Sequence, residues 1–329
     1  MKPAPFEYSR PQSVDEACAL LAADEGARLI AGGQTLVPLM AMRLARPSRL
    51  VDIARIPGLA YVREEHSVRP RASRDPGPQA TPGQSALDSR LRGNERVRGS
   101  GPNASIAIGA TTKQCTIEHD PLIRAKLPLL ATVMPYVGHG ATRARGTIGG
   151  SLANGDPAAE IVLAAATLGA TLVWREVGKS SEIAAADFFI GPMATALPLT
   201  ACLVEARFPV WPEPRVGVGF HEVNARRSDF AFVSAAAQVA LDADGSCTRA
   251  AIGIGAATAV PLRLDAVADA LVGQRFDEGA ARAAVRAALA GVEPMEDLHA
   301  SAAYRRRVAA TLAVRAIADA FRNAATRRA

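Results

Sequence analysis

RGTIGGSLANGDPAAE, residues 145–160, is a glycine-rich stretch that leads into a helical pattern. A second stretch, LIAGGQTL at residues 29–36, runs from a short apolar segment into another helical pattern. Consecutive glycines let a backbone approach a phosphate closely, and free N–H groups at a helix start favour negative charge. Each loop alone is weak evidence, because two glycines between a strand and a helix more often form a simple packing turn.

Other nucleotide-binding motifs are missing from the sequence. Residues 253–258 approach the GxGxxG pattern but lack its last glycine, and no GxxxxGK[ST] motif occurs. If the chain binds a dinucleotide, it therefore uses neither a Rossmann site nor a P-loop.

The length of 329 residues suits two domains, and a composition of 49% hydrophobic and 21% charged residues is ordinary for a soluble globular protein. The formal net charge is +6, and most of the excess lies in a C-terminal stretch with Asp319 as its one acidic residue. Its basic residues are Arg305, Arg306, Arg307, Arg315, Arg322, Arg327 and Arg328. A groove for nucleic acid would also need interleaved aromatic residues for stacking. We therefore expect no nucleic-acid binding, and instead a solvated helix face or a docking surface for an acidic partner.

The four cysteines predict neither a metal centre nor a disulfide framework. They are far apart in the sequence, with no CxxC and no histidine at ligand spacing: Cys18, Cys115, Cys202 and Cys247. The first residues lack the apolar core of a signal peptide, and the longest uncharged apolar run, residues 161–174, is too short to span a bilayer. We expect a soluble, cytoplasmic protein with reduced cysteines, no metal and no membrane insertion.

The N-terminal third predicts alternating helices and short strands. Ser13 is placed to cap a helix, followed by a strand at residues 28–30, a helix at 36–44 and a strand at 50–53. From residue 66 to 103, proline and glycine crowd a segment with hardly any large apolar side chains, which predicts disorder. Residues 61–62 and 105–108 read as the two halves of a hairpin, so the segment is interpreted as an insertion at a hairpin tip.

The middle of the chain predicts short helices around the second glycine-rich loop. Thr111 or Thr112 is expected to cap one helix, and Asp120, followed by proline, a second. The remaining expected elements follow in order: a loop at 138–155, a helix at 158–168 opened by Asp156 and Pro157, and strands at 170–174 and 203–210.

Residues 211–214, WPEP, predict a domain boundary. Beyond it we expect strands at 216–223, 232–241 and 248–254, a hairpin turn at 242–245, and helices at 262–271, 278–289 and 302–321. The whole chain is therefore expected to be α+β, with domains at residues 1–210 and 214–329.

Both glycine-rich stretches resemble the FAD motifs of one protein family. Residues 29–40, with Arg43 and Leu44 following, are similar to the first FAD motif of the medium subunits of molybdenum hydroxylases, and residues 145–160 to the second. The family includes the flavoproteins of carbon monoxide dehydrogenase and the FAD domain of xanthine dehydrogenase. The resemblance extends over nearly the whole chain. It implies a two-part FAD-binding domain of the PCMH type, followed by an α+β C-terminal domain of the CO dehydrogenase flavoprotein type.

The resemblance implies FAD-binding roles for particular residues and no catalytic residue. The first loop would wrap the pyrophosphate, the second would cradle FAD through backbone N–H groups, Glu160 would contact the cofactor and Leu203 would pack near the flavin. Asp156 is open between a cofactor contact and a helix cap. The expected FAD-binding residues are Ala31, Gly32, Gly33, Gln34, Thr35, Leu36, Ala110, Thr111, Thr147, Ile148, Gly149, Gly150, Ser151, Asp156, Glu160 and Leu203.

The sequence departs from the family pattern at several places. Asn154 and Gly155 replace a common His-Ala pair, and Glu222 lies near where some relatives place a lysine beside the flavin ring. A carboxylate there would disfavour an anionic reduced flavin. One branch, the 4-hydroxybenzoyl-CoA reductases, carries an iron–sulfur cluster in an insertion of this subunit, but the insertion at residues 66–103 has no cysteine. His139, Arg143 and Arg145 could meet FAD phosphates or a neighbouring subunit; for His139 and Arg143 the favoured alternative is a salt-bridged or solvated side chain.

The resemblance implies an oxidoreductase subunit that transfers electrons through FAD. It would take electrons from a [2Fe–2S] small subunit and pass them to NAD, a quinone or O₂, while a molybdopterin-binding large subunit oxidises the organic substrate. The complex would be a heterotrimer that dimerises. Two alternatives stay open: a self-contained FAD-dependent oxidase or dehydrogenase, and an interaction protein whose FAD site has decayed.

Overall fold

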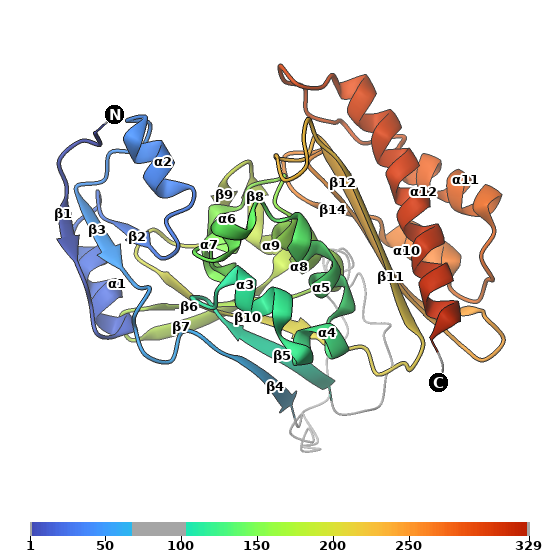
Figure 1. Ribbon diagram of the computed structural model, residues 1–329, viewed down its shortest axis with the longest axis horizontal. Helices are drawn as coiled ribbons and strands as arrows, with labels where there is room; N and C mark the ends of the chain where they lie inside the picture. Colours follow the sequence, from blue (N-terminus) through green and yellow to red (C-terminus); the bar gives the residue numbers. More distant parts are fainter. Residues whose placement is uncertain (1, 68–102, 328–329) are drawn as a thin grey trace, which may run out of the picture.

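The computed structural model describes residues 2–67 and 103–327. These residues build a three-stranded, a five-stranded and a four-stranded sheet and a two-stranded ribbon, with helices between and outside the sheets (Figure 1). None of the helices in these two ranges is long and apolar enough to cross a membrane.

An N-terminal lobe holds the first glycine-rich loop. Its parallel sheet has the order β1-β3-β2, and its elements are β1 (Glu7–Ser9), α1 (Val14–Ala23), β2 (Arg28–Ile30), α2 (Leu36–Ala41) and β3 (Arg49–Asp52). The Ser13 hydroxyl accepts a hydrogen bond from the Glu16 N–H at 3.1 Å, which begins α1 as expected. The predicted strands at 28–30 and 50–53 are confirmed, the latter shifted by one residue.

The helix predicted at 36–44 ends earlier, at Ala41. Arg43 takes a φ of 61°, in the left-handed region, and the N–H groups of Arg43 and Leu44 bond back to the carbonyls of Met40 and Leu39. This is the usual reversal at a helix C-terminus, although glycine is the residue that normally occupies the left-handed position. The sequence pattern therefore gave no sign of the helix end.

The five-stranded antiparallel sheet has the order β4-β5-β10-β6-β7. Its strands are β4 (Val62–Ser67), β5 (Asn103–Gly109), β6 (Thr171–Glu176), β7 (Lys179–Ala184) and β10 (Cys202–Pro209). The predicted hairpin is confirmed, because Val62 pairs with Ile108 and the register continues to Ser67 and Asn103. Residues 66, 67 and 103, which the sequence placed in a disordered segment, are therefore in strands, and the rest of that segment lies outside the described residues.

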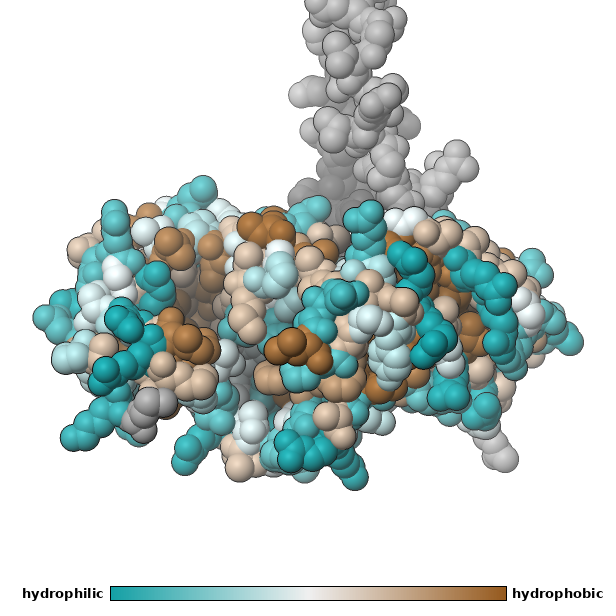
Figure 2. All heavy atoms as spheres, turned by 90° about the horizontal axis from the view of Figure 1, so that it is seen from above, coloured by the Kyte–Doolittle hydropathy of each residue, from teal (hydrophilic) through white to brown (hydrophobic). Residues whose placement is uncertain are grey.

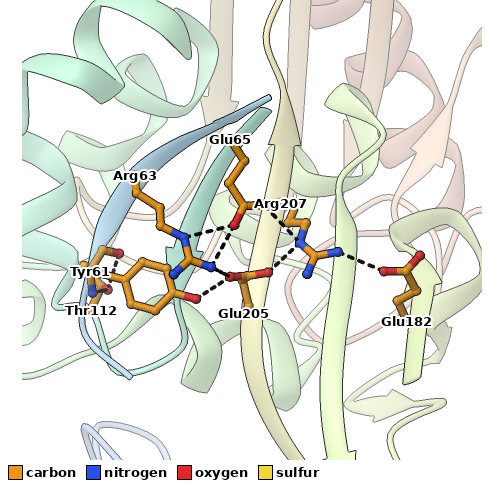
Figure 3. A network of polar contacts seen from close by, with 7 residues as sticks. All are labelled: Tyr61, Arg63, Glu65, Thr112, Glu182, Glu205 and Arg207. Carbon is orange, nitrogen blue, oxygen red and sulfur yellow. Dashed lines mark hydrogen bonds and ion pairs between the residues drawn. The ribbon is translucent and has the colours of Figure 1, made fainter. Parts of the chain in front are cut away.

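A network of polar side chains ties the hairpin to the middle of this sheet (Figure 3). Glu205 on β10 is only 4% exposed, and its carboxylate accepts hydrogen bonds from Tyr61, Arg63 and Arg207. Arg207 also contacts Glu182 on β7 at 2.9 Å. A buried carboxylate needs such partners, because an unpaired buried charge is costly. The network thus joins β4, β10 and β7 on one face of the sheet.

The other face of the sheet is covered by a layer of short helices. Their apolar side chains, including Ile117, Leu129, Leu152 and Phe188, form one core with the sheet and with Phe220 of the next domain. The elements are α3 (Gln114–His119), α4 (Pro121–Lys126), α5 (Pro128–Val133), the 3₁₀ turn η1 (Met134–Tyr136), α6 (Gly140–Arg143), α7 (Ile148–Asn154), α8 (Glu160–Leu168), α9 (Ala185–Phe188), β8 (Phe189–Gly191) and β9 (Ala194–Thr195).

Several expected helix starts in this layer differ from the structure. Asp120 caps α4 as predicted, but neither Thr111 nor Thr112 caps α3, which begins after Lys113. The Thr112 hydroxyl instead accepts the Tyr61 N–H at 2.9 Å. Helix α8 begins at Glu160, because Asp156 accepts the Ala158 N–H in a turn that precedes the helix. The stretch 138–155, expected to be a loop, contains α6 and α7.

The C-terminal part is a four-stranded antiparallel sheet with helices on its outer face (Figure 1). Its elements are β11 (Val216–Val223), β12 (Val233–Leu241), β13 (Cys247–Gly255), β14 (Leu262–Arg263), α10 (Asp265–Leu271), α11 (Glu278–Leu289) and α12 (Ala302–Thr326). The predicted strands, the turn at 242–245 and the three helices are confirmed. Two helix bounds differ: α10 starts later than residue 262, where β14 lies, and α12 continues past residue 321.

Two glycines of β11 let α12 lie directly on the sheet. A Cβ added to Gly219 would lie 2.1 Å from the Ala316 carbonyl oxygen, and one added to Gly217 would lie 2.1 Å from the Ala320 carbonyl oxygen. Both distances are far below van der Waals contact, so side chains here would force the long helix away from the strand. Glycine at these positions is therefore required by close packing.

We expect Gly219→Ala to destabilise the protein by about 1–3 kcal/mol, the usual cost of overpacking. Gly291→Ala is the matched control, because no atom lies within 4 Å of the Cβ it would add. Thermal unfolding of both variants measures the difference, which should be several degrees. Equal midpoints for the two variants would show that α12 can shift at no cost.

Candidate functional site

A cavity of about 750 Å³ lies between the two glycine-rich loops. The first loop, between β2 and α2, forms one wall, and the second loop with α7 forms another; Figure 1 places these elements on facing sides of the N-terminal lobe and the helical layer. The volume falls within the range of roughly 300–1,000 Å³ that is usual for ligand sites. The cavity is thus large enough for an extended organic ligand.

The first loop offers a row of free backbone donors to this cavity. The N–H groups of residues 32–36 find no hydrogen-bond acceptor among the described residues. Gly33 has a φ of 68°, which favours glycine, and the Gln34 side chain donates to the Gly32 carbonyl at 3.0 Å, holding the loop in shape. Successive free N–H groups in such a turn form an anion-binding concavity.

The second loop contributes shape rather than donors. The N–H groups of Ile148, Gly149 and Gly150 already donate to Thr112, Ala110 and Thr147. A Cβ on Gly149 would lie 2.5 Å from the Cβ of Ala110, so glycine is what allows α7 to start against that strand end. These three N–H groups therefore already have acceptors within the protein, and the expectation that this loop cradles the ligand stays a prediction.

The two loops touch each other through Gly32. A Cβ on Gly32 would lie 2.5 Å from the Arg145 carbonyl oxygen and 2.8 Å from the Gly146 Cα. Gly146 in turn accepts the Gln114 N–H at 2.9 Å, which fixes the start of the second loop against α3. The backbone contact therefore sets the spacing of the two cavity walls.

Most of the predicted site residues meet around this cavity. Thr111 and Ile148 do not line it: both are buried behind the wall, at 3% and 0% exposure. The predicted residues that line it are Ala31, Gly32, Gly33, Gln34, Thr35, Leu36, Ala110, Thr147, Gly149, Gly150, Ser151, Asp156, Glu160 and Leu203.

Other residues line the cavity that the sequence did not single out, or that it interpreted otherwise. His139, expected to be a solvated or salt-bridged residue, is one of them, and Gln114, Thr195, Leu199 and Phe230 are others. Met193 and Ser228 also line it and have φ values of 53° and 70°, which non-glycine residues rarely adopt. These residues come from segments without a motif, so only the folded chain brings them together.

The rim of the cavity carries exposed apolar side chains. Met193, Leu199 and Phe230 line the cavity and are 58%, 74% and 70% exposed. Figure 2 shows that apolar side chains also gather in patches, among polar ones, on the face seen from above. Large exposed apolar side chains grouped around an opening are typical of a surface that another molecule covers.

Two carboxyl groups line the cavity, those of Asp156 and Glu160, and a third, Glu222, is close enough for its charge to act on Glu160. Burial raises the pKa of Glu160 to about 8, and the charges of Glu222 and Asp156 add to the effect. Burial likewise raises the pKa of Glu222 to about 7 and raises that of Asp156. Arg143 opposes the shift of Glu160 but is bound to Glu118 by two contacts, at 2.7 and 3.2 Å. The prediction that Arg143 is salt-bridged is confirmed.

Comparisons with known proteins agree with the loops and the fold. The sequence matches the family models for the FAD binding domain in molybdopterin dehydrogenase, over residues 4–69 and 95–211, and for the CO dehydrogenase flavoprotein C-terminal domain, over residues 219–320. The 6-hydroxypseudooxynicotine dehydrogenase complex subunit alpha of Paenarthrobacter nicotinovorans is 31% identical, over 98% of this chain and 97% of that relative.

Two solved structures share the whole fold. A chain of carbon monoxide dehydrogenase from Hydrogenophaga pseudoflava superposes with a TM-score of 0.82 at 31% identity, covering 98% of this chain and 99% of that one. A chain of quinoline 2-oxidoreductase from Pseudomonas putida 86 superposes with a TM-score of 0.81 at 32% identity, covering 98% and 99%.

The fold, the loop cavity and these matches define a FAD-binding flavoprotein that serves as an oxidoreductase subunit. The chain belongs to the family of FAD-binding medium subunits of the molybdenum hydroxylases. The expected fold class is confirmed: a two-part FAD-binding domain followed by a CO dehydrogenase flavoprotein C-terminal domain. The residues present fit FAD, because free N–H groups line a cavity whose two walls meet at Gly32, where there is no room for a Cβ.

We expect Gly32→Ala to weaken FAD binding at least about tenfold, which corresponds to about 1.4 kcal/mol. The added methyl group would push the first loop off residues 145–146 and open the cavity wall. Gly140→Ala, on the nearby α6, is the control, since its Cβ would meet no atom within 4 Å. FAD bound per chain after desalting is the measurement. Equal FAD content in the two variants would exclude this loop contact as a determinant of the site.

Proposed function

We propose that this chain holds FAD between its two glycine-rich loops and is the electron-transfer subunit of a molybdenum hydroxylase complex. It takes electrons from a [2Fe–2S] subunit and delivers them to NAD, a quinone or O₂. The observation that carries the proposal is the row of free N–H groups at residues 32–36, which faces the cavity. Bound FAD supplies the chemistry that links one-electron donors to two-electron acceptors.

The chain's own residues bind and orient the cofactor in this proposal. The N–H groups of residues 32–36 bind the pyrophosphate, since they are the free donors at the cavity wall. Gly149, Gly150 and Ser151 give a smooth surface on the opposite wall, while Leu203 and Ala110 pack against the cofactor. Thr111 and Ile148 support the wall from behind. None of these residues acts as a general acid or base.

The partners are proposed from the relatives and from the cavity rim. The P. nicotinovorans relative is named as a subunit of a dehydrogenase complex. We propose that this chain assembles with a [2Fe–2S] small subunit and a molybdopterin-binding large subunit into a heterotrimer that dimerises. Met193, Leu199 and Phe230, exposed at the rim, suit a surface that a partner covers. The domain division at residues 1–210 and 214–329, and a cytoplasmic location, stay predictions.

We expect the purified chain to bind FAD but to be unable to oxidise N-heterocycles, aldehydes or carbon monoxide with a dye acceptor. Co-produced with its two partner subunits, it should form a complex that oxidises one of these substrate classes. The matched comparison is the Gly32→Ala chain in the same complex. It should assemble normally while FAD content and electron delivery to the physiological acceptor fall together.

Turnover of an organic substrate by the single chain, at tens per second, would replace this proposal with a self-contained flavoenzyme. A wild-type chain that binds FAD but never assembles with such partners would equally contradict the subunit role.

A further inference from the structure

Glu160 is a buried carboxyl group of the cavity wall, and its hydrogen bond comes from its own backbone N–H. It is the first residue of α8, it lines the cavity, and it is 7% exposed. Its side chain forms no hydrogen bond with another residue in the part of the chain that the structure describes. One backbone N–H leaves most of the hydrogen-bonding capacity of this buried carboxyl group unused, so a ligand in the cavity is the candidate further partner.

Glu222 reaches the same region from the other domain. It lies near the end of β11, and its Oε1 accepts a hydrogen bond from the Asn224 side chain at 2.8 Å. Its Oε2 is buried with no partner among the described residues. The charge of Glu222 acts on Glu160 and raises its pKa. The ionisation of the two carboxyl groups, one from each domain, is therefore coupled.

The charge of Arg143 lowers the pKa of Glu160, but the carboxyl groups around Glu160 raise it. Asp156, in the turn before α8, is also acidic, and its carboxylate accepts a hydrogen bond from the Ala158 N–H at 2.9 Å. Arg143, from α6, is held by Glu118 and by the Gly138 carbonyl at 2.9 Å. The cavity wall adds His139 before α6 and Asp229 after β11.

Burial decides which protonation state these carboxyls take. The start of α8 favours a negative charge on Glu160, but burial outweighs this effect and raises its pKa to about 8. Burial also raises the pKa of Glu222, to about 7. Its negative charge then opposes ionisation of Glu160. Burial and the charge of Glu222 therefore both favour the protonated form of Glu160.

We propose that Glu160 is a protonated hydrogen-bond donor to the bound cofactor, and that Glu222 is a positioning residue that keeps this proton on Glu160. The inference rests on the proposed FAD site and adds the direction of one hydrogen bond, from Glu160 to the cofactor. The cofactor presents an acceptor atom to Glu160, and FAD binding weakens when the solution becomes alkaline. An ionised Glu160 that accepts a hydrogen bond would produce the opposite pH dependence.

The first test is the FAD dissociation constant of the apoprotein, measured by flavin fluorescence from pH 6 to pH 9. With a pKa of about 8, the protonated fraction of Glu160 falls about tenfold between pH 7 and pH 9, and affinity should fall with it. Glu160→Gln keeps a neutral donor of the same shape, so its affinity should stay constant over this range. A wild-type affinity that is constant or increases with pH overturns the proposal.

The second test separates the pair from Glu160 alone. Glu222→Gln removes the charge that holds the proton, so affinity should begin to fall at a lower pH than in the wild type. Glu182→Gln is the control: this carboxylate on β7 is 62% exposed and contacts Arg207 in the network of Figure 3. It should show the wild-type profile. An unchanged profile in Glu222→Gln rules out the role of Glu222.

A third measurement needs no FAD. The folded pKa of Glu160 lies above its ordinary value of 4.5, so the folded state keeps a proton that the unfolded state releases. Stability should therefore fall as the pH rises from about 4.5 towards 8. Glu160→Gln should raise the thermal midpoint more at pH 8 than at pH 5, and an equal gain at both pH values contradicts the protonated state of Glu160.

If wild-type protein binds no FAD at any pH, the proposed function fails together with the inference. If it binds FAD with an affinity that does not depend on pH, only the inference fails.

Discussion

The backbone contact between Gly32 and residues 145–146 is the constraint on which the cavity depends. There the first loop, from the parallel sheet of the N-terminal lobe, meets the second loop, from the helical layer, with no room for a side chain between them. The contact brings together two parts of the chain that are more than a hundred residues apart, and both then line the same cavity. If the loops stood further apart, these donors would face water, which would compete for an anionic ligand.

The two ends of the cavity have opposite electrical character. Free backbone N–H groups lie at one wall, at the start of α2, where they favour negative charge. Carboxyl groups gather at the inner end, where Glu160 of the first domain is close to Glu222 of the second. A dinucleotide has one strongly anionic group and several neutral polar ones, and the proposed binding mode places these two kinds of group at different ends of the cavity. In that mode the pyrophosphate lies at the N–H row, and the carboxyls, when protonated, donate hydrogen bonds to neutral acceptor atoms.

The sequence predicted what depends on neighbours along the chain. Ser13 and Asp120 cap helices through their own side chains, and the two glycine-rich loops stand out by composition. What it missed depends on partners far away. The sequence suggests that Thr112 caps a helix, but its hydroxyl group accepts a hydrogen bond from the Tyr61 N–H instead. The N–H groups of the second loop look free, yet Ala110 and Thr112 accept two of them. Leu199 and Phe230 line the cavity only because folding carries them there.

The hairpin of β4 and β5 shows how this fold can change in length without losing its cofactor site. Strand β5 runs from Asn103 to Gly109, next to the cavity-lining Ala110, so the hairpin tip is at the opposite end of the strand. Glu205 and its partners tie β4 to the centre of the sheet (Figure 3), and the family match stops at residue 69 and resumes at residue 95. Extra residues can therefore be inserted between β4 and β5, either in evolution or as a reporter or affinity tag in an engineered protein.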